Sequence, residues 1–201
     1  MNITNLISNI CYRGDRRYLH STDIYTEVTN IIKRTYGDEC WITHIEFRGF
    51  LRRQVVLLPE HMFEKDITNY GKIKVKTNTS EILLTMTESD KHINCNYKDQ
   101  TDYVQKKSDI NESALSGSVI YHDSFEPIQL IVFLTKYMHT KLVSNLTKWV
   151  ASQIDVLIPL EAINTSDTIE IFIINNVANK FTLSEFFINN NKYGSIRFMA
   201  L

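Results

Sequence analysis

The feature that most limits the folds open to this chain is a long apolar run with helical spacing. Its apolar residues recur at steps of four: Leu130, Leu134, Met138, Leu142, Leu146 and Val150. Side chains four apart share one face of a helix, so the spacing predicts an amphipathic helix over about residues 128–153. Residues 128–133 are also β-prone, which leaves a strand open as the lead into this helix.

A second helical pattern lies nearer the N-terminus. The polar cluster 19–23 can cap a helix, and apolar residues follow it at helical spacing up to Gly37. We therefore expect a helix over about 22–35, with His20 just before its first turn and an irregular arm over 1–18. A histidine near a cap can be a surface residue or can face an anion bound at the helix start.

The rest of the chain is dominated by alternation that predicts strands. The segments are 41–47, 54–58, 72–76, 81–86, 114–121, 155–158, 168–174, 181–188 and 195–199. The polar stretch 88–113 has little periodicity and is predicted to be a long surface loop. Without a repeat or a Pro- or Gly-rich linker, residues 1–201 are expected to form a single α+β domain. It would be a mainly antiparallel sheet or barrel with two helices against it.

Charge and cysteine usage exclude several classes of function. The formal net charge is -1, so no global attraction to DNA or to an anionic membrane is expected. The three cysteines are far apart and form no CxxC pair, which argues against a disulfide framework and for a reducing, cytoplasmic compartment. The six histidines are dispersed, and neither a metal motif nor a glycine-rich phosphate loop occurs, so neither metal nor cofactor is expected.

Two local clusters could handle a phosphate. Tyr137 and Lys141 are four apart on the predicted second helix, which places a phenol beside an ammonium. Arg48, Arg52 and Arg53 crowd the turn between the first two predicted strands. Both clusters also have a plain structural interpretation, as a half-buried aromatic beside a solvated lysine and as solvated hairpin arginines.

The segment 55–63 resembles the catalytic-histidine segment of viral chymotrypsin-like proteases, because a strand runs into Pro59 and His61. Such an enzyme also needs a serine or cysteine nucleophile in a glycine-rich turn with an oxyanion hole. None of the cysteines has that setting, and Ser116-Gly117-Ser118 has no preceding glycine. The sequence therefore argues against an active protease and leaves a degenerate one open.

Four motifs in order resemble the poxins, the cyclic-GMP-AMP nucleases of poxviruses, baculoviruses and some moths and butterflies. They are Leu19-His20 before a helix, Leu57-Leu58-Pro59 running into Met62-Phe63-Glu64, Ala114-Leu115-Ser116-Gly117, and a helix with Tyr-x-x-x-Lys. The resemblance spans about residues 19–186. It implies a fold similar to the viral chymotrypsin-like proteases, a homodimer, and a role against cGAS–STING signalling in the host cytosol.

The resemblance also implies a catalytic triad of His20, Tyr137 and Lys141. The implied activity is metal-independent cleavage of 2′,3′-cGAMP at its 3′–5′ linkage by attack of the substrate's 2′-hydroxyl. Lys141, with its pKa lowered by burial, would polarise or deprotonate that hydroxyl, and Tyr137 would fix the hydroxyl or a phosphate oxygen. His20 would donate a proton to the leaving 5′-oxygen or orient the other two residues. Arg52 and Arg53 would contact a phosphate of the substrate.

The sequence departs from the poxin pattern near its C-terminus. Poxins grip the substrate with a basic cluster on a C-terminal strand, whereas the matching stretch 181–186 is apolar and acidic. Another cyclic dinucleotide therefore stays open as the substrate. A non-catalytic viral interaction protein on a protease-like scaffold also stays open, with 128–134 and 181–188 as its partner surface.

Overall fold

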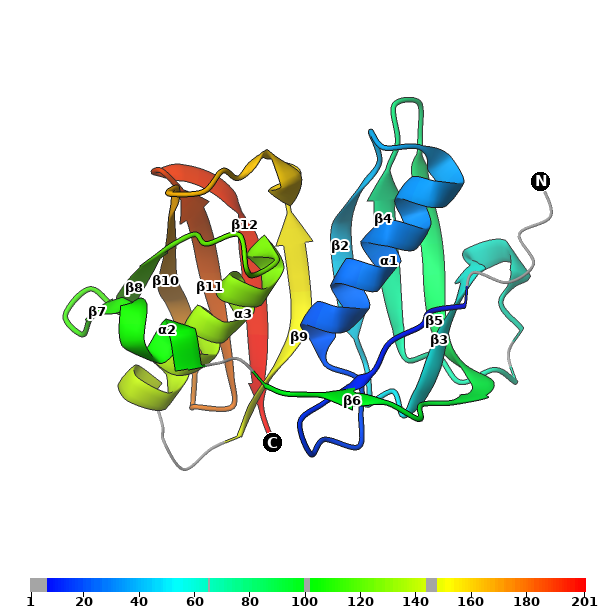
Figure 1. Ribbon diagram of the computed structural model, residues 1–201, viewed down its shortest axis with the longest axis horizontal. Helices are drawn as coiled ribbons and strands as arrows, with labels where there is room; N and C mark the ends of the chain where they lie inside the picture. Colours follow the sequence, from blue (N-terminus) through cyan, green and yellow to red (C-terminus); the bar gives the residue numbers. More distant parts are fainter. Residues whose placement is uncertain (1–6, 65, 100–101, 144–147) are drawn as a thin grey trace. The chain divides into compact units, whose positions relative to one another are not determined.

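The computed structural model describes residues 7–64, 66–99, 102–143 and 148–201 of the chain. The chain forms two compact units, Met1–Asp99 and Gln100–Leu201. The predicted single domain over 1–201 stays a prediction. Each unit combines an antiparallel sheet with one main helix (Figure 1).

The first unit places α1 (Ser21–Tyr36) against strands that pair in the order β3-β5-β4-β2. These antiparallel strands are β2 (Trp41–Phe47), β3 (Arg53–Pro59), β4 (Gly71–Lys76) and β5 (Glu81–His92). A short helical turn, η1 (Glu60–Met62), follows β3. Two short strands, β1 (Tyr12–Arg13) and β6 (Asn96–Tyr97), pair in parallel. The first-unit predictions for the helix and for these four longer strands are confirmed to within a few residues, except that β5 is longer.

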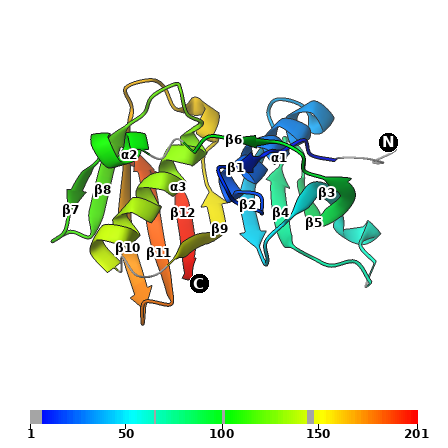
Figure 2. The same cartoon turned by 60° about the horizontal axis from the view of Figure 1, so that its bottom comes forward.

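The second unit places α3 (Pro127–Met138) across β8, β9 and β10 (Figure 2). Its strands pair in the order β9-β12-β11-β10-β8-β7. They are β7 (Asp109–Asn111), β8 (Ser116–Ile120), β9 (Trp149–Val156), β10 (Thr168–Val177), β11 (Phe181–Ile188) and β12 (Asn191–Ala200). The unit also contains α2 (Asp102–Lys107), the turn η3 (Leu160–Ala162) and η2 (His139–Val143), a π-helical turn that continues α3.

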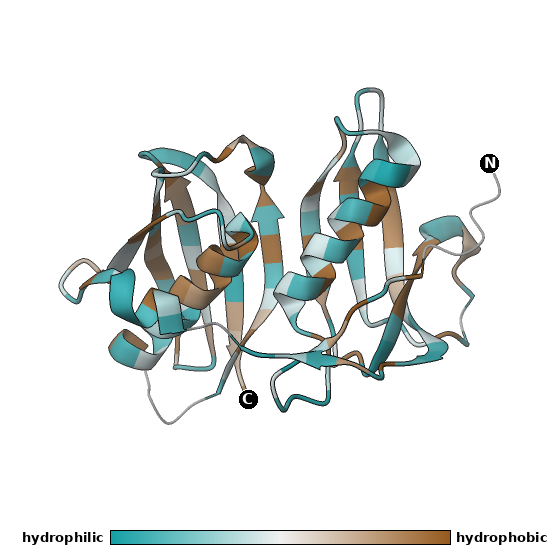
Figure 3. Cartoon of the chain, viewed as in Figure 1, coloured by the Kyte–Doolittle hydropathy of each residue, from teal (hydrophilic) through white to brown (hydrophobic). Residues whose placement is uncertain are grey.

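Alternating burial explains why these segments fold as they do. On β10 the side chains of Ile169, Ile171 and Ile173 are buried, while their neighbours point to the other face. On α1 the buried residues Ile24, Val28 and Ile32 step by four and form one apolar stripe. Figure 3 shows brown and teal residues following one another along α1 and β9. Burying each such side chain contributes about 1.5–3 kcal/mol.

The predicted barrel related to chymotrypsin-like proteases is wrong. In the described part of each unit, the strand order runs from one edge strand to another and does not return to its start. The broader prediction of antiparallel sheets with two main helices agrees with the elements observed. Alternation along a strand shows which face is buried, but it does not show whether the sheet closes on itself.

The predicted second helix is right at its start and wrong at its end. It was expected to continue to about 153, but α3 and η2 end at Val143 and β9 begins at Trp149. The predicted position Leu146 lies outside the described residues. A step of four is also an even step, so it fits a strand's period of two as well as a helical turn. Because β9 pairs with β12, residues 149–156 form a strand and not the end of the helix.

The predicted long loop over 88–113 is also wrong. That stretch contains the last part of β5, the strand β6, the helix α2 and the strand β7. These elements are short and mostly exposed, so they need few apolar residues and leave no periodic signal. The N-terminal arm was likewise predicted to be irregular, but it contains β1.

Gly194 provides a test of the packing in the second unit. It lies on β12 between Phe186 of β11 and Val156 of β9. A Cβ atom there would overlap the backbone oxygen of Asp155 and lie 2.5 Å from Cζ of Phe186. We expect Gly194→Ala to lower the free energy of unfolding by about 2 kcal/mol or more in urea titrations.

The matched control for this substitution is Gly49→Ala. A Cβ at Gly49 would lie 3.4 Å from Cδ1 of Tyr70, which is an ordinary van der Waals distance. Gly49→Ala should therefore change stability much less than Gly194→Ala does. Equal stability of the Gly194→Ala variant and the wild type would contradict the close packing of Phe186 over this glycine.

Candidate functional site

The N-terminal end of α1 is the strongest candidate site in the first unit, and His20 caps it. Nδ1 of His20 accepts a hydrogen bond from the backbone N–H of Thr22 at 3.4 Å and lies 2.9 Å from Oγ1 of Thr22. Because Nδ1 accepts from a backbone donor, the neutral ring carries its proton on Nε2. The half-buried histidine is thus held in one tautomer at a helix start. The predicted position of His20 just before this helix is confirmed.

A buried ion pair lies beside this histidine. Nη2 of Arg13 donates to Oδ1 of Asp23 and, at 2.9 Å, to Oγ1 of Thr22. The side chains of Arg13 and Asp23 are only 2% and 9% exposed. Charges buried to this extent are tolerated because they are paired, and removal of either partner would leave the other uncompensated. The pair therefore anchors the first turn of α1.

Tyr97 completes the cluster from β6. Its hydroxyl accepts a hydrogen bond from Nε of Arg13 at 2.7 Å, and its ring centroid lies 5.5 Å from the guanidinium carbon. The ring of Tyr97 is partly exposed, but desolvation of its hydroxyl, together with the neighbouring Asp23 carboxylate, raises the pKa of Tyr97 well above its ordinary value. Tyr97 therefore stays protonated and can donate to Asp23.

A disulfide joins the two strands that supply Arg13 and Tyr97. Cys11 and Cys95 are bonded across 84 residues of sequence, just before β1 and β6. The argument from cysteine spacing against a disulfide framework is therefore wrong for this pair. The expectation of a reducing compartment was based on the same argument and loses its support. The spacing gave no sign of the pair, because only the parallel pairing of two short strands brings these positions together. Cys40 is a free, buried thiol.

Carboxylates lie close to the two predicted phosphate-binding arginines. The backbone N–H groups of Arg52 and Arg53 both donate to Glu88, and Nη1 of Arg53 lies 3.8 Å from Asp90. The side chain of Arg53 is 43% exposed. The predicted phosphate contact stays a prediction, although these acidic neighbours reduce the positive potential that would support it.

Tyr137 and Lys141 belong to the second unit, so they are described apart from His20. Nζ of Lys141 lies 5.6 Å from the ring centroid of Tyr137, which confirms that the two are neighbours. Lys141 is exposed on η2, so the burial expected for a catalytic lysine is wrong. The predicted grouping of both residues with His20 stays a prediction.

His139 is the buried titratable residue that the sequence analysis missed. It is fully buried, with its ring centroid 4.6 Å from Trp149 and 5.0 Å from Phe198. Nδ1 donates to the backbone oxygen of Thr135 at 2.5 Å, and Nε2 accepts from the hydroxyl of Thr182. Burial lowers the pKa of His139 to about 4. In the sequence His139 directly follows Met138, an apolar position of the predicted helix. This neighbour was the signal that could have indicated the burial of His139.

The buried neutral ring of His139 predicts a loss of stability in mild acid. The unfolded ring takes up a proton near pH 6.5, whereas the folded ring does so only near pH 4. The stabilisation is therefore complete above about pH 6.5 and is lost as the pH falls toward 4. We expect a loss of roughly 3 kcal/mol across this window from His139, measured by urea unfolding at several pH values.

His139→Gln is the test of that assignment, because an amide can keep both hydrogen bonds without titrating in this range. The variant should lose most of the pH dependence, while the same change at exposed His122 should leave it intact. An unchanged acid loss in the His139→Gln variant would show that other groups cause it.

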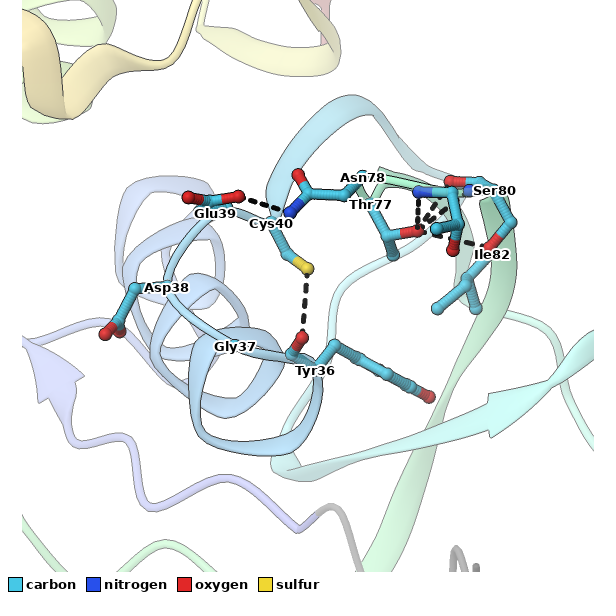
Figure 4. A pocket seen from close by; sticks show the side chains of 10 residues that line it. Tyr36, Gly37, Asp38, Glu39, Cys40, Thr77, Asn78, Ser80 and Ile82 are labelled. Atoms are coloured by element: carbon cyan, nitrogen blue, oxygen red, sulfur yellow. Dashed lines mark hydrogen bonds between the residues drawn. The ribbon is translucent and has the colours of Figure 1, made fainter.

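An open pocket of about 350 Å³ lies at the C-terminal end of α1 (Figure 4). Sγ of Cys40 donates to the backbone oxygen of Tyr36 at 3.4 Å, and Glu39 accepts from the amide of Asn78. Burial is the main cause that raises the pKa values of the Cys40 thiol and the Tyr36 phenol. The thiol is therefore a poor nucleophile, and this pocket offers no evident chemistry.

Neither metal ligation nor a membrane span is indicated by the residues that the structure describes. Among them, no group of three or more His, Cys, Asp or Glu side chains is placed to hold a metal ion. None of the described helices combines the length and the apolar character that crossing a membrane requires.

Comparison with solved structures decides the fold. The dehydratase domain of PpsC from Mycobacterium tuberculosis, in complex with C12:1-CoA, matches with a TM-score of 0.50 and 8% identity, over 97% of this chain and 87% of that one. The chain has a hot-dog fold. In this fold a long antiparallel sheet wraps around a helix, as α1 and α3 lie on their sheets. No protein-family model and no curated protein matches the sequence.

Two further structures show weaker likeness. The tesB protein MAP1729c of Mycobacterium avium matches with a TM-score of 0.45 and 6% identity, over 94% of this chain and 89% of that one. A protein with a hot-dog fold from Alicyclobacillus acidocaldarius matches with a TM-score of 0.46 and 6% identity, over 92% of this chain and 88% of that one.

The hot-dog fold overturns the poxin interpretation. The resemblance implies the fold of chymotrypsin-like proteases, whereas the chain shares its fold with the PpsC dehydratase domain. The family, the 2′,3′-cGAMP nuclease activity, the cyclic-dinucleotide partner and the viral immune-evasion role are therefore wrong for this chain. The alternative of a non-catalytic interaction protein is wrong for the same reason, because it assumed a protease-like scaffold.

Proposed function

We propose that this protein binds an acyl thioester and that His20 acts on the thioester carbonyl. The observation that carries this proposal is the fixed tautomer of His20 at the start of α1, the main helix of the first hot-dog unit. The solved structure with the TM-score of 0.50 is a dehydratase domain in complex with an acyl-CoA, which supports the choice of ligand class.

The tautomer of His20 defines the chemistry that it can perform. A neutral imidazole with its proton on Nε2 is a hydrogen-bond donor that can polarise a carbonyl oxygen. Negative charge develops on that oxygen both when an α-proton is removed and when water attacks the thioester. The same donor can therefore serve the elimination of water or the hydrolysis of a thioester.

The surrounding contacts suit this role. The ring is held by the backbone N–H of Thr22, and Thr22 is itself held by the buried guanidinium of Arg13. A donor that is fixed before the substrate arrives needs no reorganisation during the reaction. The N-terminal end of α1 also favours negative charge, which adds to the stabilisation of an oxyanion.

The test uses the purified protein with acyl-CoA esters of several chain lengths, saturated and trans-2-unsaturated. Thioester hydrolysis is followed by release of the CoA thiol, hydration by loss of the enoyl absorbance, and binding by calorimetry. We expect one of the two reactions, and we expect His20→Asn to lower kcat/KM by about a hundredfold or more.

The control is His61→Asn, an exposed histidine on η1 of the same unit. It should retain wild-type activity, and both variants should show the wild-type unfolding curve. Absence of binding and turnover with every ester would refute the acyl-thioester proposal. Full activity of the His20→Asn variant would refute the role given to His20.

A further inference from the structure

We propose that the Cys11–Cys95 disulfide is a redox latch that regulates the His20 site. In the oxidised protein the disulfide holds the first turn of α1 in the arrangement described above, and its reduction loosens that turn. The regulatory meaning of this change rests on the function proposed for His20. The structural change itself does not, and it can be measured separately.

The disulfide is accessible to a reductant. Cys95 is exposed and Cys11 is half-buried, whereas the free thiol of Cys40 is only 3% exposed. A dithiol in solvent can therefore attack the Cys11–Cys95 bond, while Cys40 is shielded from thiol reagents. Because of this difference, the Cys11–Cys95 disulfide can be reduced in the folded protein, and its two thiols can be detected without reaction of Cys40.

Besides the disulfide, a short ladder and the contact between Arg13 and Tyr97 hold the two joined strands together. β1 and β6 contain two residues each, and their register pairs Tyr12 with Asn96 and Arg13 with Tyr97. The backbone N–H of Tyr12 donates to the oxygen of Cys95 at 3.0 Å, and that of Gly14 donates to Tyr97 at 2.7 Å. Residues 94–98 are all exposed, so this ladder buries little apolar surface. A ladder this short is not stable without further support.

A second ion pair links the same two segments, but it is weaker support. Nη1 of Arg16 lies 2.7 Å from Oδ2 of Asp99, and these side chains are 22% and 27% exposed. Solvent screens the attraction between two charges with this exposure. The ion pair is also not a covalent link between the two segments. The disulfide instead confines two segments that lie 84 residues apart in the sequence.

The ladder is coupled to His20 through consecutive contacts. Arg13 follows Cys11 by two residues, and Tyr97 follows Cys95 by two. The two side chains meet through the bond from Nε of Arg13 to the Tyr97 hydroxyl. Nη2 of Arg13 also donates to Thr22, the residue that orients Nδ1 of His20. Separation of the strands therefore disturbs the support of the histidine ring.

The redox step is an ordinary thiol–disulfide exchange. A dithiol reductant attacks the Cys11–Cys95 bond, passes through a mixed disulfide and leaves as an intramolecular disulfide. The S–S bond of the protein breaks, and Cys11 and Cys95 each gain one electron and one proton. The two electrons and two protons come from the dithiol, and reoxidation by a disulfide of higher potential restores the latch.

The first experiment compares the oxidised and the dithiol-reduced wild-type protein by hydrogen exchange. Thiol alkylation under native conditions confirms that two thiols have appeared. We expect the amides of Asp23 and Ile24, which donate to the backbone oxygen of His20, to exchange about tenfold faster or more after reduction. Amides of α3 in the second unit should change less than about twofold, since all three cysteines of the chain belong to the first unit.

The second measurement follows the ring signals of the histidines by NMR in both redox states. The His20 signal, assigned with the His20→Asn variant, should shift on reduction, while those of His61 and His122 should not. The double variant Cys11→Ser/Cys95→Ser should reproduce the reduced state. Because the wild type is studied in both states, poor folding of this variant would not affect the comparison. Unchanged exchange and an unchanged His20 signal in fully reduced protein would overturn the latch.

Binding of the acyl-CoA esters separates this proposal from the proposed function. We expect the reduced protein to bind or turn over the ester at least about tenfold less well. Equal activity in both redox states would overturn the regulation and leave the proposed function intact. Changes at α1 and His20 without binding of any ester in either state would establish the latch and refute the proposed function.

Discussion

Burial of one helix face on one sheet face is the constraint on which each unit depends. An antiparallel sheet with one apolar face needs a cover, and α1 and α3 provide it in the first and second units. α1 does so with a stripe of residues at steps of four, whereas α3 is apolar around most of its circumference. The polar features of both units are arranged around this packing.

Two polar groups are buried beside these helices, and each is stabilised in a different way. Arg13 and Asp23 remain charged because they are paired, and Tyr97 and Thr22 satisfy further donors and acceptors. His139 remains neutral because burial favours the uncharged ring, and Thr135 and Thr182 occupy both ring nitrogens. The first group borders the candidate site, while the second stabilises the core of its unit.

The poxin resemblance shows how far short motifs can mislead. Its motifs describe real local features: His20 does precede a helix, and Lys141 does lie beside Tyr137. A residue before a helix and a pair one turn apart occur in many folds, so their order along the chain does not define a topology. The strand order does define it, and strand order depends on contacts between residues far apart in the sequence.

The sequence by itself determined the local elements. Its periods located α1, the start of α3 and most strands, because burial of alternate or fourth residues is visible in the order of apolar side chains. It also placed His20 at a helix start. Only the tertiary structure decided that residues 149–156 form a strand, that the described strands of each unit do not close into a barrel, that Cys11 meets Cys95, and that His139 is buried. Each of these outcomes depends on a partner distant in the sequence, and local periodicity carries no information about such partners.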